Sequence, residues 1–288
     1  MTDDRLTAGL VQMRSGRDVA GNVAAITQMV REAAARGATY VQTPENSTVM
    51  DDDKARLIAN TPKEEHSPAL ATFQALARDL GIWLHIGSMT VAASSGKLAN
   101  RAFMLSPKGE VTARYDKIHM FDVDLHGGEV YRESRSFAAG TKAVIADVPF
   151  GRIGVSICYD LRFPQLYRAL AQAGAGILTV PAAFTRKTGE LHWHTLLRAR
   201  AIENGAYVLA AAQGGLHENG RETYGHSLIV SPNGEVIAEA GIEPCVITAH
   251  IDLTKVATYR AQIPSLNHDR AFTGPQVGPA TARNEAAE

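Results

Sequence analysis

Short apolar segments of β-strand character alternate with helical segments along most of this 288-residue chain, and no other feature of the sequence constrains the fold as strongly. Leu6–Met13 is a short apolar run, and Val19–Ala35 follows it with apolar residues at helical spacing. Tyr40–Thr43 is predicted to be the next strand. The next helix is predicted from Pro68 to Leu80, because Ser67 offers a side-chain cap and proline suits a first helical position. This alternation predicts a protein of the α/β class.

The same alternation continues to a final short helix. Further strands are expected at Trp83–Met89, Ala102–Leu105, Val111–Tyr115, Ile153–Cys158, Ile177–Val180, Tyr207–Ala212, Ser227–Val230, Val236–Ala238 and Cys245–Ile251. Further helices are expected at Pro164–Ala173, at Trp193–Asn204 and after Asp252. Periodicity is lost from Asn267 onward.

A six-residue pattern, Ser-Pro-x-Gly-Glu-Val, occurs twice, at Ser106–Val111 and Ser231–Val236. Each copy joins two predicted strands, since proline sets up a turn and glycine permits positive φ. The repeat indicates two similar halves, or else a coincidence, since hairpin turns reuse the same residues. No shift in composition or long linker divides the chain. We therefore expect one domain over residues 1–270 and a tail over 271–288 that is mobile or lies at a subunit interface.

The composition excludes several classes of protein. Lys and Arg number 29 and Asp and Glu 30, and the net charge of −1 argues against binding to nucleic acid or to an anionic membrane surface. Two cysteines cannot form a disulfide scaffold, and no Cys-x-x-Cys pair is present. The first residues, Met1–Arg5, lack an apolar signal core, and no uninterrupted apolar segment is long enough to span a membrane. We expect a soluble protein of a reducing compartment, the cytoplasm.

Three reactive side chains follow predicted strands. Glu45 comes after Tyr40–Thr43, Lys117 after Val111–Tyr115, and Cys158 after the strand that leads to Ile157. Loops at the carboxyl ends of strands form the active sites of α/β folds, so a shared strand-end location would let the three converge. Together they offer a carboxylate for proton transfer, an ammonium for an oxyanion and a thiol for attack. Each alone also has an ordinary interpretation, as a solvated carboxylate, a surface lysine or a core cysteine.

Cys158 is the most informative of these residues. A turn from strand to helix would expose its thiol and direct the backbone N–H of Tyr159 toward the same point. Cys245 lies in an apolar strand and is predicted to be a core residue. No dinucleotide-binding, phosphate-loop or zinc-protease motif is present, and the run His192–His194 has no third ligand at a useful spacing. His226 is expected to be a hydrogen-bonded structural residue, and no metal is expected.

Four blocks of sequence resemble the nitrilase, or carbon–nitrogen hydrolase, superfamily, and the likeness extends from Leu6 to about Arg270. They are Thr43–Asn46, Tyr115–Asp122, Gly154–Pro164 and Leu196–Asn204. Within the superfamily the chain looks most like the Nit branch, which includes deaminated glutathione amidase and ω-amidase. The segments Ala210–Gly214 and Tyr224–Ser227 are more similar to the former. One departure is His194, where relatives commonly have glutamate.

The resemblance implies a four-layer αββα sandwich of two similar halves, a homodimer or larger homo-oligomer, and no metal or organic cofactor. It also implies that Glu45 is the base, that Lys117 and the Tyr159 N–H stabilise the oxyanion, and that Cys158 is the nucleophile. Glu133 matches a second family glutamate, which either orients Lys117 and the substrate or is only a structural salt-bridge partner. The reaction implied is hydrolysis of a small carboxamide to a carboxylate and ammonia through a thioester.

The substrate-binding residues are less determined by the sequence. A substrate carboxylate would need an arginine, and the candidates are Arg162 and Arg186, although Arg162 could instead pair with Asp160. Phe184 and Thr185 follow a predicted strand and are expected to line the pocket, although Phe184 could be core. Because relatives commonly have a glutamate at the position of His194, the sequence does not determine the identity of the substrate. The alternatives are an ω-amidase acting on α-ketoglutaramate, a nitrile or N-carbamoyl hydrolase, an acyl transferase, a redox thiol protein and a non-catalytic binding protein.

Overall fold

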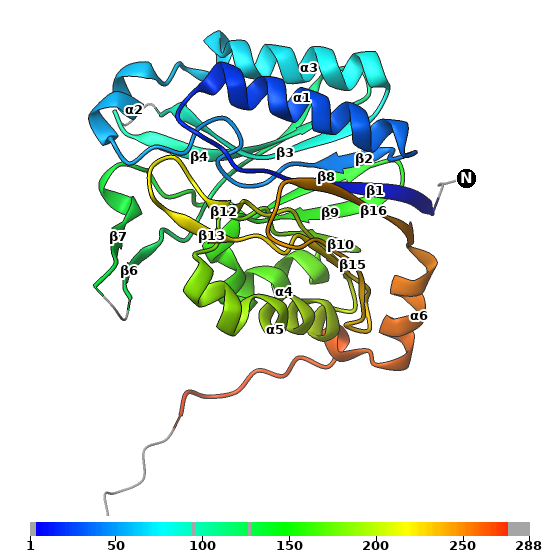
Figure 1. Cartoon of the computed structure of the whole chain (residues 1–288). Coiled ribbons are helices and arrows are strands. Elements are labelled where there is room, and N and C mark those ends of the chain that lie inside the picture. Colours follow the sequence, from blue (N-terminus) through cyan, green and yellow to red (C-terminus); the bar gives the residue numbers. More distant parts are fainter. Residues whose placement is uncertain (1–3, 94–95, 126–127, 276–288) are drawn as a thin grey trace, which may run out of the picture.

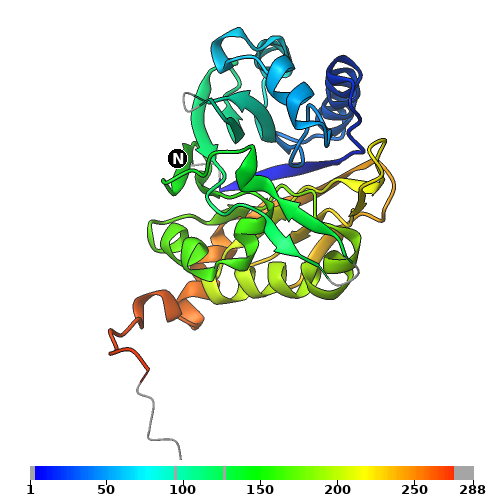
Figure 2. The same cartoon turned by 90° about the vertical axis from the view of Figure 1, so that its left-hand side faces the viewer.

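The computed structural model describes residues 4–93, 96–125 and 128–275. Two six-stranded sheets pack face to face, and helices cover the outer face of each sheet (Figure 1). The view turned by 90° shows the same stacking of helices, sheet, sheet and helices (Figure 2). The four-layer αββα sandwich expected from the sequence is confirmed.

The first half of the chain forms the sheet with the strand order β16-β1-β2-β3-β4-β5. Strands β1, β2 and β3 are parallel, whereas β4, β5 and β16 run antiparallel to their neighbours. Helices α1 and α3 cover the outer face (Figure 1). The elements are β1 (Arg5–Gln12), α1 (Val19–Ala35), β2 (Tyr40–Gln42), α2 (Lys54–Asn60), α3 (Pro68–Leu80), β3 (Trp83–Ala92), β4 (Leu98–Leu105), β5 (Val111–Asp116) and the late strand β16 (Cys245–Asp252).

The second half repeats this arrangement in the order β15-β14-β11-β10-β9-β8. Strands β9, β10 and β11 are parallel, and β8, β14 and β15 are antiparallel to their neighbours. Helices α4 and α5 cover its outer face (Figure 1). The elements are β8 (Val144–Val148), β9 (Gly151–Val155), a 3₁₀ helix (Cys158–Arg162), α4 (Pro164–Gln172), β10 (Ile177–Thr179), α5 (Arg186–Asn204), β11 (Tyr207–Ala210), β14 (Leu228–Val230) and β15 (Val236–Glu239).

The repeated Ser-Pro-x-Gly-Glu-Val pattern occupies equivalent places in the two sheets. Ser106–Glu110 joins β4 to β5, and Ser231–Glu235 joins β14 to β15. In both turns the serine N–H donates to the glutamate carbonyl, and the glycine N–H donates to the serine carbonyl. Because the turns match in hydrogen bonding and in sheet position, the pattern reflects two similar halves and is not a coincidence.

Three apolar cores correspond to the three interfaces between the four layers. Leu10 of β1 and Leu209 of β11 belong to the core shared by the two sheets. Ile26 of α1 and Phe73 of α3 pack on the outer face of the first sheet, and Trp193 of α5 does so on the second. Strands with apolar side chains on both faces are expected wherever a sheet is covered on both sides.

Several elements escaped the sequence analysis, and all of them are short. They are α2, the strand β8 and the two-stranded pairs β6 (Asp122–Asp124) with β7 (Val130–Arg132) and β12 (Gly214–Leu216) with β13 (Glu222–Tyr224). Helix α5 begins at Arg186, seven residues before the predicted start at Trp193. The predicted strand Ile153–Cys158 ends at Val155, and Cys158 begins a 3₁₀ helix instead.

The chain ends with α6 (Thr254–Gln262) and a 3₁₀ turn (Ser265–Asn267). Strand β16 returns to pair with β1, and the two sheets share one core, which favours the prediction of a single domain over residues 1–270. That boundary and the role of the tail stay predictions, and residues 276–288 lie outside the described part. Among the described residues, no helix has the length and apolar character needed to cross a membrane.

Candidate active site

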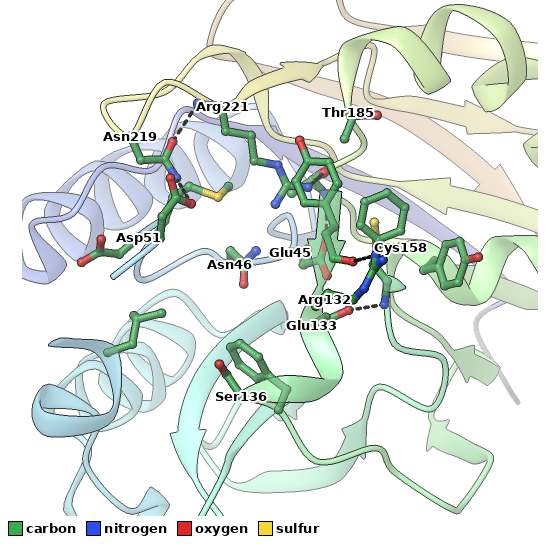
Figure 3. A pocket seen from close by; sticks show the side chains of 18 of the residues that line it. Glu45, Asn46, Asp51, Arg132, Glu133, Ser136, Cys158, Thr185, Asn219 and Arg221 are labelled. Carbon is green, nitrogen blue, oxygen red and sulfur yellow. Dashed lines mark hydrogen bonds between the residues drawn. The ribbon is translucent and has the colours of Figure 1, made fainter. Parts of the chain in front are cut away.

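A pocket of about 590 Å³ opens at the carboxyl ends of strands from both sheets, a volume typical of small-molecule sites. Glu45 follows β2, Lys117 follows β5 and Cys158 lies beyond the end of β9, and all three line this pocket. The structure thus brings together three residues that lie 72 and 41 positions apart in the sequence. Figure 3 shows Glu45, Glu133 and Cys158 grouped at one end of the cavity.

Lys117 lies between two carboxylates. Its ammonium Nζ donates to Oε1 of Glu45 at 2.9 Å and to Oε2 of Glu133 at 2.9 Å. Glu133 also accepts the backbone N–H of Phe121 at 2.7 Å. On the other side, Oε2 of Glu45 accepts the backbone N–H of Ala183 at 2.9 Å. These bonds fix both carboxylates and leave the ammonium little freedom to move.

The charges of this group shift the pKa values of its members. Burial alone would raise the pKa of Glu45, but the Lys117 ammonium outweighs it and the pKa is lowered. Burial would lower the pKa of Lys117, but the negative charges of Glu133 and Glu45 outweigh it and the pKa is raised. Burial and the charge of Glu45 raise the pKa of the Cys158 thiol well above its usual value. At neutral pH the pocket therefore holds a carboxylate, an ammonium and a neutral thiol.

The backbone at Cys158 is in the left-handed region, with φ of 49°, which few residues other than glycine adopt. Its N–H donates to the carbonyl of Pro181 at 2.9 Å, which ties the turn to the segment after β10. Asp160, two residues on, is fully buried and accepts the N–H of Ile157 at 2.9 Å and the Tyr115 hydroxyl at 2.6 Å. The turn is thus held on both sides of the cysteine, and such strain is common at functional sites.

Two side chains that support Glu45 were not found from the sequence. Nδ2 of Asn100, in β4, donates to Glu45 at 2.9 Å and to Glu133 at 3.2 Å. Nε2 of Gln213 donates to the carbonyl of Glu45 at 2.9 Å and to the Ser15 hydroxyl at 2.7 Å. Both residues are neutral amides inside the fold. Gln213 lies in the segment Ala210–Gly214 that resembles the family, but nothing in the sequence marks either amide as a partner of Glu45.

Of the predicted substrate-binding residues, Tyr159, Phe184 and Thr185 line the pocket. Phe184 also packs against Trp193, so the pocket and core interpretations are both correct for it. Arg162 and Arg186 were the candidates for a substrate carboxylate, and neither lines the pocket.

The guanidinium of Arg162 lies 5.4 Å from the ring of Phe184, on an aromatic group that also includes Tyr159. It does not pair with Asp160 either, because that carboxylate is occupied by the donors described above and by His119. Arg186 is exposed and pairs with Glu190 and Glu222. The structure favours neither prediction, because Arg162 packs on the rings of Phe184 and Tyr159, Arg186 is held in ion pairs, and neither residue lines the cavity.

His194 lies outside the pocket lining, so the unusual residue there does not remove a carboxylate from the site. Its Nε2 contacts Oε1 of Glu239 at 2.8 Å, and Nδ1 of His226 contacts the same oxygen at 2.9 Å. These three side chains have ligand atoms within 4.8 Å of one another and could hold a cation, an arrangement that sequence spacing did not reveal. The expected hydrogen bonding of His226 is confirmed.

Cys245 was predicted to be a core residue and is only partly buried. It begins β16, which is the edge strand of the first sheet, so one side of the strand lacks a partner. Cys245 is not among the residues that line the pocket, and both cysteines are free thiols.

Comparison with known proteins identifies the class of enzyme. Residues 7–261 match the family model described as carbon–nitrogen hydrolase. A match over this much of the chain defines a hydrolase that acts on carbon–nitrogen bonds other than peptide bonds. The chain belongs to the carbon–nitrogen hydrolase family.

Individual relatives are similar over nearly the whole chain. A deaminated glutathione amidase from Yersinia enterocolitica is 41% identical over 273 residues, which cover 91% of this chain and 92% of the relative. The human omega-amidase NIT2 is 35% identical over 273 residues, covering 94% of this chain and 96% of the relative. The chain is thus similar to amidases of the branch indicated by its sequence blocks.

Solved structures agree with this grouping. The C. elegans NitFhit protein superimposes with a TM-score of 0.87 at 36% identity, covering 94% of this chain and 66% of that protein. The present chain therefore spans about two thirds of NitFhit. A mutant of an amidase from Nesterenkonia sp. AN1, which carries acrylamide added at its active-site cysteine, has a TM-score of 0.76 at 25% identity, covering 90% of this chain and 98% of that protein.

Proposed function

We propose that this enzyme hydrolyses a small carboxamide through a thioester on Cys158, with Glu45 as the proton carrier and Lys117 as the oxyanion partner. The observation that carries the proposal is the direct contact of Lys117 with Glu45 at 2.9 Å, in a pocket that Cys158 also lines. A nucleophile, a base and a cation are the minimum set for acyl transfer from an amide.

The first half of the reaction forms the thioester. Glu45 removes the proton of Cys158 while the sulfur attacks the amide carbon. The lowered pKa of Glu45 and the raised pKa of the thiol keep the base ionised and the nucleophile neutral until the substrate arrives. The carbonyl oxygen becomes an oxyanion that accepts hydrogen bonds from Lys117 and from the N–H of Tyr159. Removal of one such donor typically costs about 3 kcal/mol, or a hundredfold or more in rate.

The second half releases the acid. Glu45, now protonated, gives its proton to the departing nitrogen, which leaves as ammonia from a primary amide or as an amine from a substituted one. The carbon–nitrogen bond breaks and the carbon–sulfur bond remains. Glu45 then takes a proton from water, and the hydroxide attacks the thioester carbon. The carbon–sulfur bond breaks, Glu45 returns its proton to the sulfur, and the acid product leaves. One carboxylate serves throughout because its acid and base steps alternate.

Glu133 is proposed to be a positioning residue. It contacts Lys117, Asn100 and the backbone of Phe121, so its carboxylate is engaged by groups of the protein itself. Its side chain holds the ammonium beside Glu45 and adds negative charge that keeps Lys117 protonated.

Deaminated glutathione or a similar ω-amide is the proposed substrate, because the relative with 41% identity is a deaminated glutathione amidase. Hydrolysis of α-ketoglutaramate is the second candidate, favoured by the similarity to an omega-amidase. We further propose a cytoplasmic homodimer or larger homo-oligomer. Two free thiols suit a reducing compartment, and light scattering of the purified protein tests the assembly.

A substrate panel tests the function. Deaminated glutathione, α-ketoglutaramate, an N-carbamoyl amino acid and an aliphatic nitrile are incubated with the native enzyme and with the Cys158→Ser variant. We expect hydrolysis of at least one of the two amides by the native enzyme and none by the variant. Turnover of only the carbamoyl compound or the nitrile would contradict the assignment.

A further inference from the structure

Arg221 extends toward the reactive group from the loop between β12 and β13, and it lines the pocket (Figure 3). Its Nη2 donates to the carbonyl oxygen of Ala183 at 2.6 Å. The N–H of the same Ala183 donates to Oε2 of Glu45 at 2.9 Å. Ala183 therefore connects the guanidinium of Arg221 to Glu45, the proposed base. The positive charge of Arg221 also contributes to the lowered pKa of Glu45.

Among the described residues, no carboxylate oxygen lies within ion-pair distance of the Arg221 guanidinium, and its buried Nε lacks a hydrogen-bond partner. The charges of Glu45 and Glu129 interact with it only at longer range. Two other cations that line the pocket are paired, Lys117 with two glutamates and Arg132 with Asp124 at 2.7 Å. Partial burial of an unpaired charge costs free energy, and an anion bound to this guanidinium would offset that cost.

The surroundings hold the guanidinium in place. Its carbon lies 5.4 Å from the centre of the Tyr131 ring, and its backbone N–H donates to the Asn219 side chain at 3.0 Å. The loop is anchored by His217, whose ring nitrogens contact the Ser15 carbonyl at 2.9 Å and the Thr223 hydroxyl at 2.7 Å. A guanidinium fixed in this way presents paired N–H groups without further loss of side-chain freedom, the geometry that suits a carboxylate.

We propose that Arg221 binds a carboxylate of the substrate at a distance from the scissile amide and so selects amides that carry an acid group. The inference deepens the proposed function and depends on it for the identity of the scissile bond. It also assigns to Arg221 the task for which the sequence suggested Arg162 and Arg186, which lie outside the cavity.

Two amides of similar length test the assignment: glutaramate, which carries a carboxylate, and valeramide, which does not. In Arg221→Met, kcat/KM for glutaramate is expected to fall about 10- to 100-fold, the range of a charge-assisted hydrogen bond, mainly through KM. Valeramide should lose only what the altered contact with Ala183 and the altered charge near Glu45 cost, so its loss should be at least fivefold smaller than that of glutaramate. Arg221→Lys should give an intermediate loss on glutaramate, since it retains the charge but not the paired donors.

Arg132→Met is the matched control, because Arg132 lines the same pocket but already pairs with Asp124. It should not discriminate between the two amides. Equal losses on both amides in Arg221→Met, no loss on either, or the same selective loss in Arg132→Met would overturn the proposal.

A binding measurement separates this proposal from the proposed function. Titration calorimetry with glutarate, the dicarboxylate product of glutaramate hydrolysis, needs no turnover. Weaker binding by at least tenfold in Arg221→Met supports the carboxylate site even if the native enzyme hydrolyses neither amide, in which case only the amidase proposal fails. Equal binding to the native enzyme and the variant would overturn the role of Arg221.

Discussion

Glu133→Gln separates a residue that positions Lys117 from one that transfers protons. The substitution keeps the size of the side chain and removes one of the two negative charges that contact the Lys117 ammonium at 2.9 Å. A pair of unit charges about 4 Å apart at an effective dielectric constant of about 20 is worth about 4 kcal/mol, equivalent to about three pKa units. Loss of this negative charge destabilises the ammonium, so the pKa of Lys117 must fall from its raised value.

The assay is the pH dependence of kcat between about pH 6 and pH 11 with a soluble primary amide. Because the oxyanion needs the protonated lysine, we expect the activity of Glu133→Gln to fall in the upper part of this pH range, whereas the raised pKa of Lys117 protects the native enzyme from such a fall. At neutral pH the loss should be about ten- to a hundredfold, since Glu45 is still present. Glu129→Gln is the control, as Glu129 lines the pocket but pairs with Lys187.

Either of two results would refute this reasoning. One is a pH profile of kcat in which Glu133→Gln and the native enzyme behave alike at alkaline pH. The other is a loss at neutral pH as large as that of Glu45→Gln, which would make Glu133 a participant in proton transfer.

Three further predictions concern other parts of the site. Gly87→Ala places a Cβ 2.0 Å from the backbone carbonyl oxygen of Thr43, so we expect the free energy of unfolding to fall by about 3 kcal/mol and the Tm to drop. Gly241→Ala, which has open space around its Cβ, should leave the Tm unchanged, and equal melting temperatures of the two variants would contradict this reasoning. Cys245→Ser should keep full amidase activity while Cys158→Ser loses it, and the reverse pattern would favour the redox interpretation. Glu45→Gln removes a negative charge that raises the pKa of the Cys158 thiol, so the pH midpoint for alkylation of Cys158 by iodoacetamide should move to lower pH. An unchanged midpoint would argue against an electrostatic interaction between Glu45 and Cys158.

The sequence predicted those features whose causes are local. Helix α1 has the predicted bounds, Val19–Ala35, because apolar spacing and a stop at Gly37 define it. The reactive residues were found because each lies just past a strand, where loops of an α/β fold meet. The two repeated turns gave the internal symmetry, because their proline and glycine meet the same backbone requirements in both sheets.

The features that were missed depend on contacts between distant segments. Asn100 looks like any polar residue of a strand until β4 is placed beside β3 and its amide reaches Glu45. Arg221 lies between two three-residue strands that have no apolar periodicity. Arg162 lies close to the nucleophile in sequence, but its guanidinium packs on the rings of Phe184 and Tyr159, and Arg162 does not line the cavity. Side-chain direction in such loops is set by tertiary packing, which no local pattern encodes.

The most direct test of the mechanism is the mass of the intact enzyme quenched in acid during turnover of a primary amide. We predict a species heavier than the free enzyme by the acyl group of that amide, carried on the peptide that contains Cys158 and absent from Cys158→Ser. If rapid hydrolysis proceeds with no such species at any quench time, or if the acyl group is found on a residue other than Cys158, the thioester mechanism is wrong.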